Sequence, residues 1–204
     1  MTILFIWSQR GGKSLAIDRR QQIIDAATKS FSLYGYKATT MDQVAKLGNV
    51  GKGTIYTFFK NKEELFDVII TDLITNMRQV ATEAIDPSLP FKNNVHQALY
   101  GMLEFRLKHQ LTIKLFQEDR DIGTPIVQDV MGQVENEILS FISDKVRIAI
   151  DNKQIQDCDP ELTAFILMKL YIALIFDWER NHEPLGKEDI AKIFDLYLLQ
   201  GLSI

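Results

Sequence analysis

Apolar residues recur at steps of three and four along nearly the whole chain from Asp18 onward. In the first such segment these positions are Ile23, Ile24, Ala27, Phe31 and Tyr34. This period places an apolar stripe along one side of a helix, whereas a half-buried strand would alternate apolar and polar residues. Breaks fall at glycines and prolines, first at Gly35 and later at residues 86–90. The sequence therefore predicts an all-α fold.

Residues 39–62 differ from the rest because their predicted helices are short and closely spaced. Thr40 and Gln43 have the spacing of a capping box, which predicts the start of a helix. Gly48 and Asn49 interrupt this helix, and a third helix follows over residues 50–59. Two short helices joined by so tight a turn must cross at a large angle, which is the arrangement of a helix-turn-helix.

Charge is divided unevenly along the chain of 204 residues. Residues 1–62 carry a net charge of +7 and residues 63–204 carry −11, which leaves −4 overall. A basic segment before an acidic remainder is typical of a protein in which only the first part contacts a polyanion. We therefore expect residues 49–62, which are rich in lysines and hydroxyl groups, to meet the phosphates of a nucleic acid.

Other functional classes find little support in the sequence. Cys158 is the lone cysteine, so no internal disulfide is expected and the cytosol is the expected compartment. No run reaches the roughly 18 apolar residues that a membrane helix needs. His96, His109 and His182 share no ligand spacing, so no metal or cofactor is expected. Because no nucleophile elbow, phosphate loop or oriented triad is present, we predict no catalytic residues.

Residues 1–17 show no helical period, and we interpret them as a disordered arm. Two alternatives stay open for this segment. Translation of the natural protein would begin near Leu15 in the first alternative. In the second, the segment is a basic arm that reaches into a DNA minor groove through Arg10 and Lys13.

Many fixed spacings in residues 20–66 carry a family resemblance. The residues that carry it are Ala26-Ala27, Phe31, Gly35-Tyr36, Thr39-Thr40-Met41, Val44-Ala45, Val50, Lys52-Gly53-Thr54-Ile55-Tyr56, Phe59 and Asn61-Lys62-Glu63-Glu64-Leu65. This run resembles the DNA-binding domain of TetR-family transcriptional regulators. The resemblance implies an all-helical homodimer, in most cases a repressor, with a C-terminal ligand-binding domain. It covers about a quarter of the chain, and the remainder is similar only as an all-helical, ligand-sensing body.

Seven residues are the predicted DNA contacts: Thr40, Lys52, Gly53, Thr54, Tyr56, Thr57 and Lys62. We expect the hydroxyl and lysine side chains to bind phosphates or sugars, which fix the register of the protein on DNA. Bases would be read by the backbone at Gly53, by threonine methyl groups at Thr54 and Thr57, and by Lys52 at a guanine.

Two residues depart from the family pattern in this stretch. Gly51 stands where serine or threonine usually starts the recognition helix, and it supplies no side-chain oxygen. Phe58 stands where a tyrosine or histidine often reaches a phosphate. Both changes remove polar contacts, so the grip on phosphates should depend more strongly on Lys52, Tyr56 and Lys62.

The predicted domains are a helix-turn-helix domain over residues 18–64 and a helical ligand-binding and dimerisation domain over residues 65–204. A long fourth helix starts after the cap residue Asn61 and belongs to both domains. Two helices near the end, over residues 160–178 and 187–202, are apolar on nearly every face. Such helices must be buried all round, and a four-helix bundle between two copies would bury them. We expect a homodimer through these two helices.

A ligand pocket is predicted inside the second domain. The candidate residues are Phe105, Arg106, His109, Phe116, Met168, Tyr171, Ile172 and Phe176. Bundle interiors are common ligand sites, although each of these residues would also serve to pack a core. The pocket composition favours a largely hydrophobic effector, such as a fatty acyl, aromatic or drug-like molecule, with Arg106 or His109 near its polar end.

These observations predict a ligand-responsive repressor that leaves a palindromic, double-stranded DNA operator when its effector binds. Two alternatives stay open. One is a helical protein that binds DNA or protein partners without small-molecule control, and the other is an enzyme. Sequence-independent binding would indicate the first alternative. Turnover that survives the loss of residues 1–62 would indicate the second.

Overall fold

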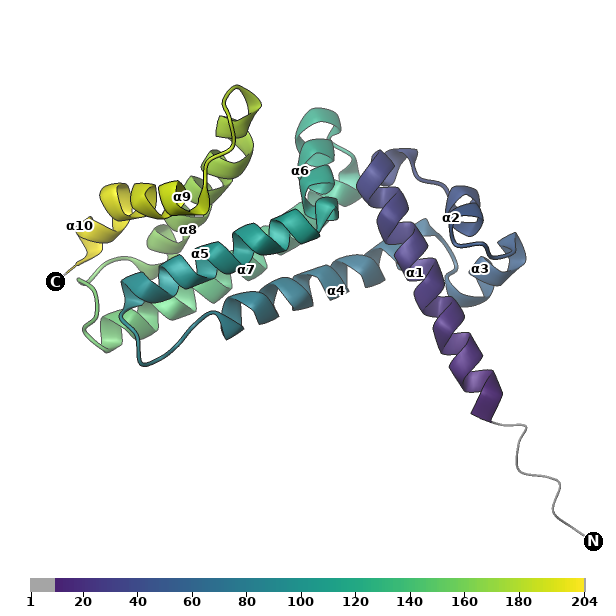
Figure 1. The fold of residues 1–204 in the computed structure, drawn as a ribbon, viewed down its shortest axis with the longest axis horizontal. Coiled ribbons are helices and arrows are strands. Elements are labelled where there is room, and N and C mark those ends of the chain that lie inside the picture. Colours follow the sequence, from purple (N-terminus) through teal and green to yellow (C-terminus); the bar gives the residue numbers. More distant parts are fainter. Residues whose placement is uncertain (1–9, 204) are drawn as a thin grey trace, which may run out of the picture. The chain divides into compact units, whose positions relative to one another are not determined.

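The computed structural model describes the backbone of residues 10–203 and the side chains of residues 19–203. The described part is all-α and contains no strand, which confirms the predicted fold class (Figure 1). Its main helices are α1 (Arg10–Ala38), α2 (Met41–Leu47), α3 (Lys52–Phe58), α4 (Lys62–Glu83), α5 (Phe91–Lys108), α6 (Gln110–Ile122), α7 (Pro125–Asp151), α8 (Pro160–Ile172) and α9 (Lys187–Phe194). Short π and 3₁₀ turns extend α8 and α9, and a final turn, α10, covers Gln200–Leu202.

The chain forms two compact units. The first contains residues up to Leu73 together with His109–Gln128, and the second contains Ile74–Lys108 and Asp129–Ile204. This division departs from the predicted boundary between residues 64 and 65, chiefly because α6 packs against α1 (Figure 1). The helix-turn-helix therefore shares its unit with a helix from the middle of the chain.

Aromatic rings form the centre of the first unit. The ring centroids of Phe31 and Phe66 are 5.2 Å apart, and those of Tyr36 and Phe66 are 4.6 Å apart. From α3 and the residue that follows it, Ile55 and Phe59 are also buried. Burying each such side chain stabilises the fold by about 1.5–3 kcal/mol. This core holds α1, α3 and the start of α4 together.

Helix α1 begins at Arg10, eight residues before the start that the helical period predicts. Residues 10–17 are thus helical in backbone, in contrast to the disordered arm that the sequence indicates, and residues 1–9 lie outside the described part. Gly35 interrupts the helix with φ of 83°, a conformation that glycine adopts without a steric penalty. The predicted break at Gly35 is therefore present, and one helical turn follows it to Ala38.

The second unit has its own apolar core, which includes Phe91, Leu99, Val146, Ala149, Ile155, Leu167, Ile175, Ile190, Phe194 and Leu199. These residues come from α5, α7, α8, α9 and their extensions, with Ile155 from the connection after α7, so the unit is a helical bundle. Its last two helices each continue into a π-helical turn, over Ala173–Asp177 and Asp195–Leu199.

Candidate nucleic-acid interface and effector site

Helix α2 begins with the capping box that the sequence predicts. The Gln43 N–H donates to Oγ1 of Thr40 over 3.2 Å, and the Thr40 N–H donates to Oε1 of Gln43 over 2.8 Å. Met41, Val44 and Ala45 are buried beneath the helix. Thr40 itself is exposed at the helix start, where helix N–H groups and a hydroxyl favour a phosphate. Its role as a DNA contact stays a prediction.

Helix α3 buries one side and exposes the other. Ile55 is fully buried, whereas Lys52, Gly53 and Thr57 are exposed and Tyr56 is 46% exposed. Thr54, the remaining predicted contact on this helix, is half-buried. The exposed side thus gathers four of the predicted DNA contacts on a helix of only seven residues.

Gly51 and Gly53, at the start of α3, have different structural roles. Gly51 is the N-cap residue of α3 and makes no side-chain cap bond, as expected from its lack of a side-chain oxygen. An added Cβ at Gly53 would meet no described atom within 4 Å. Packing therefore does not demand glycine at position 53, which is compatible with a role in letting another molecule approach the backbone.

Lys52 pairs with a carboxylate on the neighbouring helix. Its Nζ lies 2.8 Å from Oδ1 of Asp42 and donates a hydrogen bond to Oδ2 over 2.9 Å. This hydrogen bond raises the pKa of Lys52 above its ordinary value. Both side chains are more than half exposed. Exposed ion pairs contribute little to the free energy of folding, so the Lys52 ammonium can leave Asp42 to bind a phosphate.

Lys62 has a structural role that the sequence did not reveal. Its Nζ donates to the carbonyl oxygens of Tyr36 and Thr39, each over 3.0 Å, and lies 4.1 Å from the centroid of the Tyr36 ring. Burial lowers the pKa of this ammonium. Two of its three N–H bonds are therefore used inside the unit, and only the third is left for the phosphate contact that the sequence predicts.

Glu118 of α6 is a second residue that sequence reasoning missed. It is 3% exposed, and its carboxylate accepts the N–H of Tyr36 over 2.6 Å and that of Lys37 over 2.9 Å. A signal for it exists in the sequence, because Glu118 falls on the same face of α6 as Leu111 and Leu115, which are buried. A carboxylate within an apolar stripe indicates a buried partner.

The predicted ligand-pocket residues do not all lie in one unit. His109 and Phe116 belong to the first unit, and the other six belong to the second. Within the second unit, Phe105 and Met168 are buried, whereas Arg106, Tyr171, Ile172 and Phe176 are partly buried. Among them, Arg106 of α5 contacts the ring of Phe176 in the π turn after α8, and Tyr171 of α8 lies within electrostatic range of Arg106. The role of the whole set as a ligand pocket stays a prediction.

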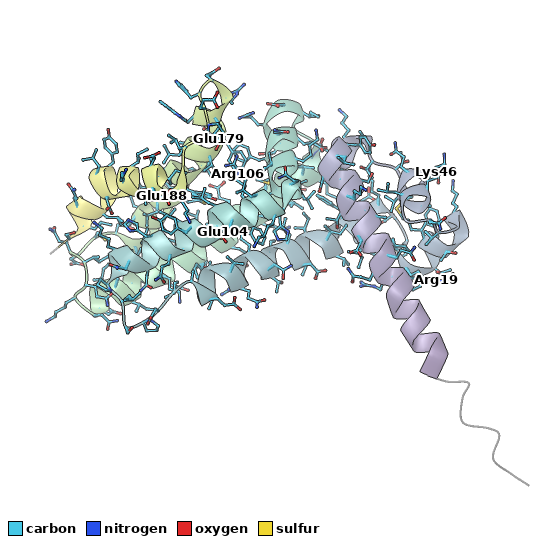
Figure 2. All side chains as sticks on the ribbon, in the orientation of Figure 1. Arg19, Lys46, Glu104, Arg106, Glu179 and Glu188 are labelled. Carbon is cyan, nitrogen blue, oxygen red and sulfur yellow. The ribbon has the colours of Figure 1, made fainter. Side chains whose placement is uncertain are left out.

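Arg106 of α5 is paired with Glu179, which lies in the 3₁₀ turn beyond α8 (Figure 2). Its guanidinium binds Glu179 through two hydrogen bonds, Nη1 to Oε1 over 3.0 Å and Nη2 to Oε2 over 2.5 Å. It also lies 5.2 Å from the centroid of the Phe176 ring. Its buried Nε has no hydrogen-bond partner among the described residues. Burial also raises the pKa of Tyr171, whose hydroxyl is within electrostatic range of Arg106 and Glu179.

No three His, Cys, Asp or Glu side chains among residues 19–203 lie in a group that would hold a metal ion. None of the described helices combines the length and apolar character needed to cross a bilayer.

Comparison with known proteins adds a family assignment to this geometry. The family model for bacterial regulatory proteins of the tetR family matches residues 23–69, which cover the helix-turn-helix and the start of α4. An uncharacterised HTH-type transcriptional regulator of Bacillus subtilis (strain 168), YhgD, is 62% identical over 189 residues. This alignment covers 93% of the chain and 99% of that protein.

Solved structures share the fold at lower identity. GusR of Salmonella enterica has a TM-score of 0.73 and 18% identity, with 96% of this chain and 98% of that chain covered. The fatty acid degradation regulator FadR from Bacillus halodurans has a TM-score of 0.71 and 16% identity, with 89% of this chain and 94% of that chain covered. At these identities the similarity shows the fold alone.

Proposed function

Because this chain belongs to the TetR family of DNA-binding transcriptional regulators, we propose that it is a ligand-responsive repressor. In this proposal two copies bind a palindromic operator in the cytosol, and a small, largely hydrophobic effector releases them. The observation that supports it best is the exposed face of α3, which presents Lys52, Gly53, Tyr56 and Thr57 beside the capped start of α2.

The contacts with DNA are proposed to divide into two groups. Thr40, Lys52 and Tyr56, with the free N–H of Lys62, bind phosphates and fix the register of the protein. Thr54 and Thr57 meet thymine methyl groups, and Gly53 lets the backbone approach the bases. Two copies would place α3 in successive major grooves, so the half-sites should lie about one helical turn, roughly 34–36 Å, apart or somewhat farther.

A homodimer is proposed through the last two helices. Leu162, Phe165 and Ile166 of α8 are exposed in the single chain, and so are Leu196 and Tyr197 of the π turn after α9. Exposed apolar side chains gathered on two neighbouring segments favour association. The same face meeting itself across a two-fold axis would bury them.

The proposed effector site is the cluster around Arg106. Large apolar side chains there favour a hydrophobic body, and the unpaired Nε of Arg106 favours an acceptor group, such as a carboxylate, at one end. A fatty acyl ligand fits both requirements, and FadR from Bacillus halodurans is described as a regulator of fatty acid degradation. For a complete switch, the effector must bind the DNA-incompetent state about 10⁴-fold more tightly.

The decisive experiment starts from the purified full-length protein. Random duplexes selected in vitro should converge on an inverted repeat, and fluorescence anisotropy should then measure a salt-dependent preference for that repeat over random DNA. Fatty acids and aromatic acids are next added to the complex at fixed salt. Selection that yields no shared sequence would contradict operator recognition, and release by no hydrophobic acid would contradict the proposed effector class alone.

A further inference from the structure

The Glu118 carboxylate lies between the α6 backbone and the end of α1. Oε2 accepts the Tyr36 N–H, and Oε1 accepts both the Lys37 N–H and the Thr124 hydroxyl, the latter over 2.8 Å. Hydrogen bonds to an ionised group are about twice as strong as those between neutral groups. Glu118 is thus a buried carboxylate held by three donors from two segments.

Gly35 makes this contact sterically possible. With φ of 83°, a Cβ at this position would lie 2.4 Å from Oε2 of Glu118, a distance that real Cβ atoms do not show. The missing side chain therefore leaves the space that the carboxylate occupies. From the other side, Lys62 of α4 binds the carbonyl oxygens of Tyr36 and Thr39. The turn after Gly35 is held at its N–H groups by α6 and at its carbonyls by α4.

This turn leads directly into the helix-turn-helix. Thr39 is fully buried, and its hydroxyl donates to the carbonyl oxygen of Gly35 over 2.8 Å. The next residue, Thr40, is the N-cap of α2. A shift of the turn would therefore move α2, and α3 would follow because Gly48–Gly51 is a short, hydrogen-bonded connection in which the Val50 N–H donates to the Ala45 carbonyl.

We propose that Glu118 is a positioning residue for DNA recognition, through which α6 holds the turn before α2 in the DNA-competent conformation. The inference rests on the operator binding proposed above. Along the chain, α6 lies between α5, which ends at Lys108, and α7, most of which belongs to the second unit. A change in either helix reaches α6 through the covalent chain. Loss of the carboxylate leaves the buried N–H of Tyr36 and the partly buried N–H of Lys37 without their acceptor.

The test compares full-length variants on the duplex that the wild-type protein selects. Glu118→Gln keeps the size of the side chain, but its amide nitrogen must face one of the donors that the carboxylate accepts. We expect operator affinity to fall by roughly 5- to 150-fold, the range typical of coupled sites, and amide exchange at Tyr36 and Lys37 to accelerate. Thr124→Val keeps the carboxylate but removes one donor, so it should also lower operator affinity, by a smaller factor.

The matched control is Val146→Ala, which removes methyl groups from the buried core of the second unit and touches neither α6 nor the turn. This variant should lower the unfolding temperature yet leave operator affinity within about twofold. Operator affinity retained by both Glu118→Gln and Thr124→Val would overturn the inference. An equal loss of affinity in Val146→Ala would also overturn it, because the effect would then reflect stability alone. If the wild-type protein selects no sequence, the operator proposal itself fails.

Discussion

Tyr56 offers the sharpest test among the single side chains of the recognition surface. Its ring is partly exposed on α3, and its hydroxyl is the group proposed to reach a phosphate. Tyr56→Phe should weaken binding to operator and to random DNA alike, by about 1 kcal/mol or roughly fivefold, because a phosphate contact contains no sequence information. Anisotropy titrations on both duplexes measure this. A changed ratio between the two affinities would reassign Tyr56 to base reading.

Lys62 should behave differently from the other predicted contacts, because its ammonium binds two carbonyl groups within the protein. Lys62→Met should lower the free energy of unfolding by about 1–3 kcal/mol, since it leaves both acceptors without their charged donor. Thermal unfolding without DNA measures the loss. Lys60→Met is the control, because the Lys60 side chain is exposed and the change in charge is the same. Equal effects of the two substitutions would argue against the structural role.

Substitution of glycine by alanine should have opposite effects on stability at Gly35 and at Gly53. Gly35→Ala places a methyl group against Glu118 at a positive φ, so it should destabilise the fold by about 1–3 kcal/mol. Gly53→Ala lies in α3 with open space around it and should stabilise the helix by up to about 1 kcal/mol. Urea unfolding measures both changes.

Gly53→Ala should nevertheless reduce operator affinity if the backbone of α3 approaches the bases, because the added methyl group occupies that space. An anisotropy titration with the selected operator checks this, and Gly132→Ala in α7 provides a control with equally open surroundings. Operator affinity unchanged in Gly53→Ala would remove Gly53 from the predicted contacts.

Some structural features could be predicted from the sequence, and others could not. The capping box of α2, the break at Gly35 and the exposed face of α3 follow from residues near one another in the chain, so local patterns predict them. Where α6 meets the end of α1, Glu118 accepts hydrogen bonds from Tyr36 and Lys37, which lie 82 and 81 positions earlier in the chain. No local period encodes such a pair. For the same reason the ligand cluster was predicted without Glu179, which lies 73 positions from Arg106.

The proposed dimer interface can be tested by measuring whether two copies of the chain associate. Phe165→Glu puts a charge on the exposed apolar face of α8, so two copies should no longer associate. Sedimentation equilibrium should give the mass of one chain, and operator affinity should fall because the second half-site contact is lost. Leu33→Glu, at an exposed position of α1, should leave the mass of the dimer unchanged. A dimer that persists in Phe165→Glu would require another interface.

The position of α6 within the first unit bears on how regulators of this kind can be recombined. A hybrid made by joining residues 1–73 to the body of a different regulator would carry the N–H groups of Tyr36 and Lys37 without the Glu118 carboxylate that accepts them. We therefore expect the graft to lose affinity for the operator even if every residue of the recognition helix were retained. Engineering of a sensor from this chain should transplant residues 109–128 with the amino-terminal segment, since the two segments belong to one compact unit.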